Sequence, residues 1–161
     1  MQVTLAILAG GVGKRLWPLS TEDKPKQFIK MLSDKSLLEE TILRFENIKV
    51  NNIEIIAGKK HKKHLKNIKK ISERDISIIY EPSQKNTCPS ILLAALANPG
   101  STLIISPSDH YISDISSFSN LIKKGLEIAE RNKIVSIGIK PSSANDQYGY
   151  IQKGKKKGPF F

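Results

Sequence analysis

Three glycines and several cationic side chains are concentrated near the N-terminus. Gly10, Gly11 and Gly13 follow an apolar run, and Arg15 and Lys26 come shortly after them. Glycine lets backbone N–H groups approach a ligand closely because it has no Cβ. Clustered N–H dipoles beside Arg and Lys form a cradle for an anion, and phosphate suits such a cradle best. The alternative interpretation is a tight turn after a strand, with no ligand.

This loop matches neither of two common phosphate-binding loops. A Walker A loop ends in Gly-Lys-Ser/Thr, and no such tripeptide follows the glycines. The dinucleotide fingerprint requires a third glycine where this chain has Leu16. A phosphate-binding loop of another type remains.

A second polar segment follows the apolar run 102–106 and contains Asp109 and His110. A carboxylate at the end of a strand, beside a triphosphate, suits Mg²⁺, which prefers oxygen ligands and often combines one or two carboxylates with phosphates. The alternative is an ordinary turn or cap. A zinc site is disfavoured, because the other histidines, His61 and His64, lie in a lysine-rich segment and no further ligand cluster is present.

The segment 81–90 predicts the start of a helix, with Asn86 or Thr87 as its cap and Pro89 in its first turn. A helix N-terminus presents free N–H groups to an anion or a base carbonyl. A capped helix without a ligand is the simpler interpretation, and it is compatible with the first. Cys88 is the only cysteine, so an internal disulfide is excluded. No partner base for a nucleophilic thiol is evident, so we expect a small buried residue there and not a nucleophile.

The elements that must position these residues alternate along the chain. Apolar runs predict five strands, at 3–8, 53–57, 76–80, 102–106 and 134–139. Helical periodicity predicts helices at 37–47, 59–71, 88–97 and 117–132, the first with a capping box of Ser36 and Glu39. This order predicts an α/β fold with a parallel sheet covered on both faces. The loops after the first, third and fourth strands then meet at the carboxyl edge of the sheet, where such folds bind ligands.

The chain has 161 residues and a net charge of +11, a size that fits one domain with a proper core. Arginine supplies only four of the 26 cationic side chains, whereas reading of nucleic acid bases favours arginine. We therefore interpret the lysines of 59–71 as a solvated helix face with no specific nucleic acid partner; attraction of polyanions is the alternative. No apolar stretch is long enough for a bilayer and no signal peptide is evident, so a cytoplasmic protein is expected, without a membrane partner.

The amino-acid sequences of two segments resemble the motifs of a known protein family. Residues 8–20, Leu-Ala-Gly-Gly-Val-Gly-Lys-Arg-Leu-Trp-Pro-Leu-Ser, and residues 25–28, Pro-Lys-Gln-Phe, resemble the sugar-phosphate nucleotidyltransferases, and among them the mannose-1-phosphate guanylyltransferases. The segments 81–90, 106–110 and 137–151 are similar to further motifs of that family. Lys14 departs from the pattern, which has a small residue there. The resemblance implies a three-layer, Rossmann-like nucleotidyltransferase fold with a mostly parallel sheet, truncated after about the first half of the catalytic domain.

The resemblance also implies roles for individual residues. Arg15 and Lys26 would be catalytic, Arg15 at the leaving pyrophosphate and Lys26 at the α-phosphate or the sugar phosphate. Asp109 would bind Mg²⁺, the implied cofactor, and Gly149 would border the sugar phosphate; a polar loop without a ligand is the alternative for that segment. Nucleotide binding would fall to nine residues, namely Leu8, Ala9, Gly10, Gly11, Gly13, Glu81, Asn86, Thr87 and Ser108.

The function implied is transfer of GMP from GTP to mannose-1-phosphate, which gives GDP-mannose and pyrophosphate. Residues 1–161 would form the N-terminal, nucleotide-binding part of the catalytic domain. Because the family's later sugar-binding and metal-binding segments are absent, a catalytically deficient nucleotide-binding module, or one half of a split enzyme, is the main alternative. A missing C-terminal half or a homo-oligomer would complete the site. A lysine-rich polyanion-binding domain is the weaker alternative.

Overall fold

The structure is a computed structural model and describes residues 2–11, 13, 16–66, 68–83, 85–146 and 148–156. Arg15 and Lys14 lie outside the described residues, so the role predicted for Arg15 stays a prediction. The described helices include none with both the length and the apolar composition that a membrane span requires.

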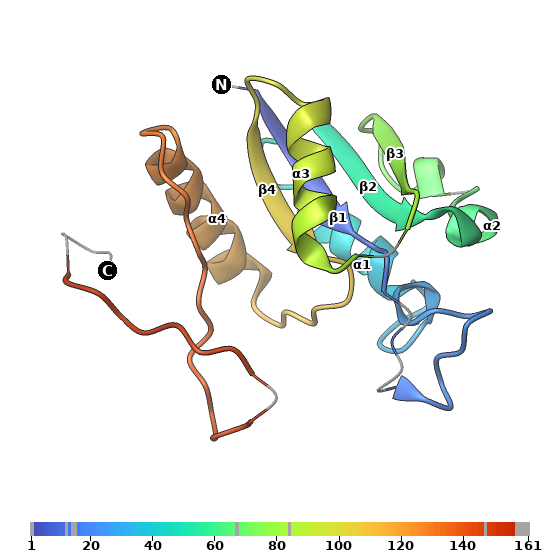
Figure 1. The fold of residues 1–161 in the computed structure, drawn as a ribbon. Coiled ribbons are helices and arrows are strands. Elements are labelled where there is room, and N and C mark those ends of the chain that lie inside the picture. Colours follow the sequence, from blue (N-terminus) through green and yellow to red (C-terminus); the bar gives the residue numbers. More distant parts are fainter. Residues whose placement is uncertain are drawn as a thin grey trace.

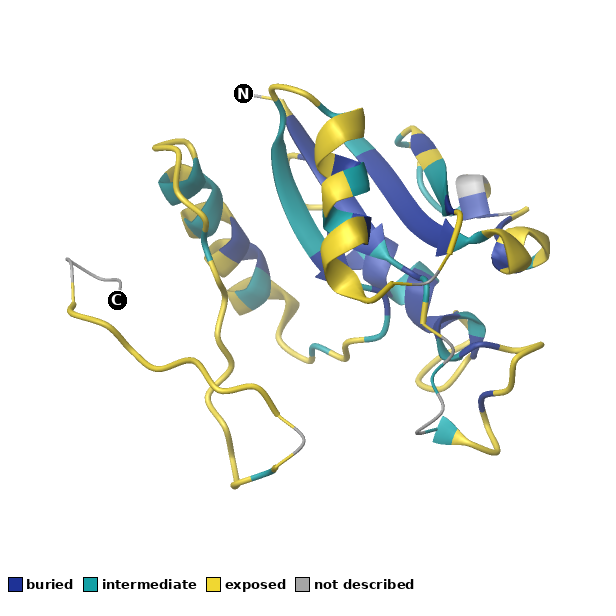
Figure 2. Ribbon diagram, in the orientation of Figure 1, coloured by how far each residue is buried: buried dark blue, intermediate teal, exposed yellow. Residues whose placement is uncertain are grey.

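Four parallel strands form the sheet of the described chain (Figure 1). They are β1 (Val3–Leu8), β2 (Asn52–Gly58), β3 (Ile76–Glu81) and β4 (Thr102–Pro107), in the order β3-β2-β1-β4. The first four predicted strands are confirmed, because each run rich in Val, Ile and Leu pairs with a parallel neighbour. The central strands β1 and β2 are almost wholly buried, whereas β4 at the edge is half-buried (Figure 2).

Helices cover the two faces of the sheet and give the predicted three layers. Alternate residues of β1 serve opposite faces: Leu5 and Ile7 join the larger core, and Ala6 joins the smaller one. Helices α1 (Leu37–Arg44) and α4 (Ile115–Ala129) pack into the larger core. Helix α3 (Thr87–Ala97) packs on the other face through Ala94. The sheet is therefore a rigid base whose carboxyl edge carries the loops of interest.

The ends of α1 are fixed by side chains. The predicted capping box is confirmed: the Glu39 backbone N–H donates to Ser36 Oγ at 3.3 Å, and the Ser36 N–H donates to Glu39 Oε2 at 2.5 Å. At the other end the Arg74 guanidinium donates to the carbonyls of Phe45, Glu46 and Ile48 at 2.9, 2.6 and 2.9 Å. The capping box satisfies N–H groups that a helix start leaves without partners, and Arg74 holds the turn that follows Arg44, the last residue of α1.

The predicted single helix over 59–71 is wrong. The segment forms three short pieces, η3 (Lys59–His61), α2 (Lys62–Leu65) and η4 (Ile68–Lys70). Like charges three and four residues apart repel on a helix, and α2 has no side-chain cap. The apolar residues Leu65 and Ile68 are still buried in the larger core. Burial therefore holds the segment on the body of the domain without continuous helix.

The predicted fifth strand at 134–139 is also wrong, since residues 133–140 have no regular structure. Ile134 is fully exposed and Ile139 is 83% exposed. A strand satisfies its backbone only by pairing, and within the described chain β4 pairs with β1 alone.

Cys88 was expected to be buried, but it is exposed in the first turn of α3, because that helix turns Ser90 and Ala94 toward the sheet.

Candidate active site

The candidate site lies where the order of the strands reverses direction. From β1 the chain continues to β2 on one side, whereas β4 later pairs with the other side of β1. Leu8 and Pro107, the last residues of β1 and β4, are register partners, so the loops that follow them part at this point. In open parallel sheets such a switch point is where ligands bind.

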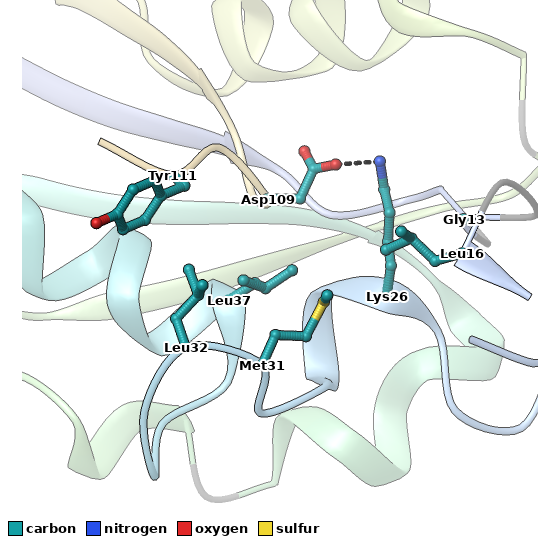
Figure 3. Close-up of a pocket in the computed structure, with 8 residues that line it drawn as sticks. All are labelled: Gly13, Leu16, Lys26, Met31, Leu32, Leu37, Asp109 and Tyr111. Atoms are coloured by element: carbon teal, nitrogen blue, oxygen red, sulfur yellow. Dashed lines mark hydrogen bonds and ion pairs between the residues drawn. The ribbon is translucent and has the colours of Figure 1, made fainter. Parts of the chain in front are cut away.

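Two charged side chains meet at this point (Figure 3). Asp109 comes two residues after β4, and Lys26 begins the short helix η2 (Lys26–Phe28). The Lys26 Nζ donates a hydrogen bond to Asp109 Oδ2 and forms an ion pair with it. Their side chains are 28% and 21% exposed, so both ends of the pair stay within reach of a ligand.

Gly13 packs directly against the side chain of Lys26. A Cβ at Gly13 would lie 2.6 Å from both Cβ and Cγ of Lys26, and the φ of Gly13 is +78°. Side chains are disfavoured at that φ, so both conformation and space require glycine here. The Gly13 carbonyl accepts hydrogen bonds from Ser20 Oγ at 2.5 Å and from the Leu16 N–H at 2.9 Å. The glycine loop therefore fixes the direction in which Lys26 extends.

The glycine loop also rests on buried polar side chains. Gln27 is fully buried and donates from Nε2 to the carbonyl of Ala9 at 2.7 Å. Glu81 is 6% exposed and accepts a hydrogen bond from Ser90 Oγ. A Cβ on Gly10 would lie 2.6 Å from Glu81 Oε2, so glycine at this position lets the loop cross directly above the carboxylate. Loop, β3 and α3 are thus joined beneath the site.

The structure distributes the predicted nucleotide-binding residues unevenly. Gly10, Gly11 and Gly13 lie in the loop, and Leu8 and Ala9 form its base. Asn86 and Thr87 are exposed at the start of α3, with a φ of 63° at Asn86. Glu81 and Ser108 are buried, so their side chains do not face solvent, and Glu81 accepts a hydrogen bond from Ser90 Oγ. Gly149 is exposed in the segment after α4, which runs apart from the sheet (Figure 1); its role stays a prediction.

Beside the Lys26–Asp109 pair lies a cavity of about 600 Å³, a size typical of small-molecule sites. The charged pair forms one side of it, and the other side chains that line it are apolar apart from the Tyr111 hydroxyl. Its lining consists of Gly13, Leu16, Lys26, Met31, Leu32, Leu37, Asp109 and Tyr111 (Figure 3). The arrangement can hold a group that is both charged and partly apolar.

Comparison with known proteins decides the family. The family model described as "Nucleotidyl transferase" matches residues 5–158. This chain belongs to the nucleotidyl transferase family. A mannose-1-phosphate guanylyltransferase of Escherichia coli is 39% identical in an alignment of 156 positions that covers 92% of this chain and 34% of that protein. One from Klebsiella pneumoniae is 35% identical, over 92% of this chain and 32% of that protein.

A solved structure supports the same relationship. The crystal structure of a mannose-1-phosphate geranyltransferase from Thermus thermophilus superposes with a TM-score of 0.87 and 30% identity. The match covers 98% of this chain and 47% of that one. This nucleotidyl transferase chain therefore spans about a third of the length of the curated relatives it matches, and about half of that solved chain.

The donor set of this nucleotidyl transferase fits a magnesium ion held jointly with a nucleotide. Within the described ranges, no three His, Cys, Asp or Glu side chains come together as an all-protein metal site. Mg²⁺ commonly takes one or two carboxylates together with substrate phosphates and water. Asp109 offers one carboxylate that already attracts a cation, the Lys26 ammonium, at the edge of the cavity.

Sequence reasoning missed two buried polar residues of the site, Gln27 and His61. Gln27 stands within the quoted Pro-Lys-Gln-Phe motif, and a polar residue between Lys26 and Phe28 was the available signal. His61 is 1% exposed and its ring contacts Phe28 edge-on at 5.7 Å. Among the described residues, neither His61 ring nitrogen nor Gln27 Oε1 has a hydrogen-bond partner of acceptable geometry.

Burial is the main reason why the pKa of His61 lies below its ordinary value. The charge of Lys60 and the nearby His64 ring lower it further. The backbone of Ala9 and the carboxylate of Glu81 act in the opposite direction without overcoming burial. His61 is therefore neutral beneath the glycine loop at neutral pH.

We expect acidification to destabilise the fold through His61. The unfolded chain has a histidine pKa of about 6.5 and the folded pKa of His61 is lower, so the unfolded state binds more protons between the two values. The free energy of unfolding should fall as the pH drops through about 6.5 toward the folded pKa, and then level off. Urea unfolding at pH 8 and pH 5.5 measures this.

The matched variants are His61→Leu, which should lose that part of the pH dependence, and His110→Gln, which removes an exposed histidine and should keep it. Equal pH dependence in all three proteins would contradict the role of His61.

Proposed function

We propose that this chain binds GTP at the switch point of its sheet. In a protein of its relatives' length, this part would serve the transfer of GMP to mannose-1-phosphate. The observation that carries the proposal is the meeting of Lys26 and Asp109 beside Gly13, at the edge where the β1 and β4 loops part. Guanine as the base and mannose as the sugar are proposed from the names of the relatives, which are mannose-1-phosphate guanylyltransferases. Residues 1–161 are then the nucleotide-binding part of the catalytic domain.

In the proposed reaction a phosphate oxygen of mannose-1-phosphate attacks the α-phosphorus of GTP. The bond from that phosphorus to the bridging oxygen breaks, and pyrophosphate leaves with the electron pair. Such chemistry depends on positioning and on neutralising charge more than on covalent intermediates. When bound, Mg²⁺ would supply Lewis-acid neutralisation of phosphate charge.

Each residue of the site has its own role in the proposed transfer of GMP. The backbone N–H groups of Gly10, Gly11 and Gly13 would surround the triphosphate. Lys26 would contact the α-phosphate or the incoming sugar phosphate, and Asp109 would hold the Mg²⁺. Arg15, outside the described residues, would neutralise the leaving pyrophosphate. Asn86 and Thr87 would offer the start of α3 to the nucleotide, and Gly149 would border the sugar.

A second candidate function within the same family is a nucleotide-binding module, or one half of a split enzyme. It would use the same Lys26–Asp109 site to bind the nucleotide, without turnover by this chain alone. A third candidate, a polyanion-binding domain, rests only on the net charge of +11.

One set of measurements separates these candidates. Calorimetric titration of purified residues 1–161 with GTP, UTP and dTTP in Mg²⁺ should give binding that is tightest for GTP. Pyrophosphate release in the presence of mannose-1-phosphate would favour the enzyme, and GTP binding without release would favour the module. RNA binding that exceeds GTP binding and falls steeply with salt would favour the polyanion domain and refute the proposal.

A further inference from the structure

Lys26 and Asp109 form an unusual ion pair among those of the described chain. The other two pairs, Lys35–Asp34 and Lys63–Asp23, have carboxylates that are 88% and 96% exposed. Ion pairs with such exposed carboxylates contribute little to the stability of the fold. Both partners of Lys26–Asp109 are mostly shielded, and 83 residues separate them in the sequence. A long-range pair that tertiary structure holds together in this way has a specific place in the site.

The proposed function, on which this inference rests, gives these two residues different partners. Lys26 is assigned to phosphate and Asp109 to the divalent cation. In the structure the Lys26 ammonium instead lies on Asp109 Oδ2. Two cations at one carboxylate oxygen repel each other strongly at such short range. The Lys26 contact therefore competes with a divalent cation for Asp109 Oδ2, and the ammonium also repels a cation at the other carboxylate oxygen.

We propose that Lys26 is the resident counter-ion of Asp109 in the nucleotide-free protein and exchanges partners when a metal–nucleotide complex binds. The ammonium moves from Asp109 to the triphosphate, and the divalent cation takes its place on the carboxylate. Each charge is then paired both before and after binding. As a consequence, a free divalent cation is kept off Asp109 until the triphosphate arrives to receive Lys26.

The packing around Lys26 suits such an exchange. Its stem is fixed, because Cβ, Cγ and Cδ lie against the backbone of Gly13. Its end is less confined: a Cβ at Gly11 would lie 3.9 Å from Lys26 Cε, an ordinary van der Waals distance, so the loop does not clamp the end of the side chain. Only the last torsions of Lys26 need to change, and rotamer changes of this kind are fast. Both partners also keep some exposure, which gives a ligand access.

The exchange is tested first without any nucleotide. Mn²⁺, counted by electron paramagnetic resonance, is titrated into wild type, Lys26→Met, Lys24→Met and Asp109→Asn. Lys26→Met keeps an apolar stem on Gly13 and removes the ammonium, so we expect Mn²⁺ to bind about tenfold more tightly than in wild type. Lys24→Met removes the same charge at an exposed position nearby and should leave the affinity unchanged. Asp109→Asn should abolish the binding.

A second arm measures GTP binding with EDTA present. Asp109→Asn releases Lys26 for the triphosphate and should bind metal-free GTP several-fold more tightly than wild type, whereas Lys26→Met should bind it more weakly. Equal Mn²⁺ affinity in Lys26→Met and Lys24→Met, or metal-free GTP binding that Asp109→Asn leaves unchanged or weakens, would overturn the exchange. If no variant binds GTP, the proposed function fails, and the Mn²⁺ arm alone decides whether Lys26 is the counter-ion.

Discussion

Replacing Gly13 by alanine is expected to weaken GTP binding by about 30- to 100-fold, which corresponds to about 2–3 kcal/mol. Two costs combine at this position: a φ of +78°, and a Cβ that would lie within 2.8 Å of three Lys26 carbons. Either the loop or Lys26 has to move, and each movement displaces a group proposed to hold phosphate. Calorimetric titration with GTP and Mg²⁺ measures the loss.

Two other glycines provide matched controls for Gly13→Ala. Gly100 has a nearly identical φ of +77°, but its Cβ would meet nothing within 4 Å. Gly100→Ala should therefore lower the melting temperature through backbone strain while leaving GTP affinity unchanged. Gly154→Ala has neither strain nor contact and should change nothing. Wild-type GTP affinity in Gly13→Ala, or an equal loss in Gly100→Ala, would contradict the role of the Gly13–Lys26 contact.

The sequence predicts the sheet well because strands β1 to β4 are encoded locally. Runs such as 3–8 and 53–57 are mostly apolar, and in an α/β chain only a parallel sheet covered by helices buries both faces of such strands. The chain order then brings the loops after β1, β3 and β4 to one edge. That edge is where Gly13, Lys26 and Asp109 meet.

The wrong predictions concern segments whose structure depends on neighbours. Residues 134–139 have the composition of a strand, but β-structure requires a paired partner, and periodicity carries no information about one. The prediction of one helix at 59–71 rested on apolar spacing and did not take into account the repulsion among the lysines of that segment. The burial of Glu81 and Gln27 was likewise missed, because motif wording indicates that a residue belongs to a site without indicating whether it faces the ligand or supports the loop.

The contact between Lys26 and Asp109 leads to the second large expected effect. Exchanging the two charges in the double variant Lys26→Asp/Asp109→Lys should keep an ion pair at the same place and preserve the fold. Binding of GTP with Mg²⁺ should nevertheless fall at least about 100-fold, because a carboxylate would face the triphosphate and an ammonium would stand where the metal ligand was. Calorimetry measures binding, and thermal unfolding measures stability.

The exchanged pair separates a structural contact from a functional one. A salt bridge that only braces the loops has no preferred direction, so the double variant would then recover both the melting temperature and the GTP affinity that either single variant loses. In a site for a triphosphate and a divalent cation the direction matters, because phosphate requires the cation at position 26 and metal requires the carboxylate at position 109. We therefore expect the melting temperature to recover and GTP affinity to stay lost. Recovery of both would reduce the pair to a structural brace and remove the observation on which the proposed function depends.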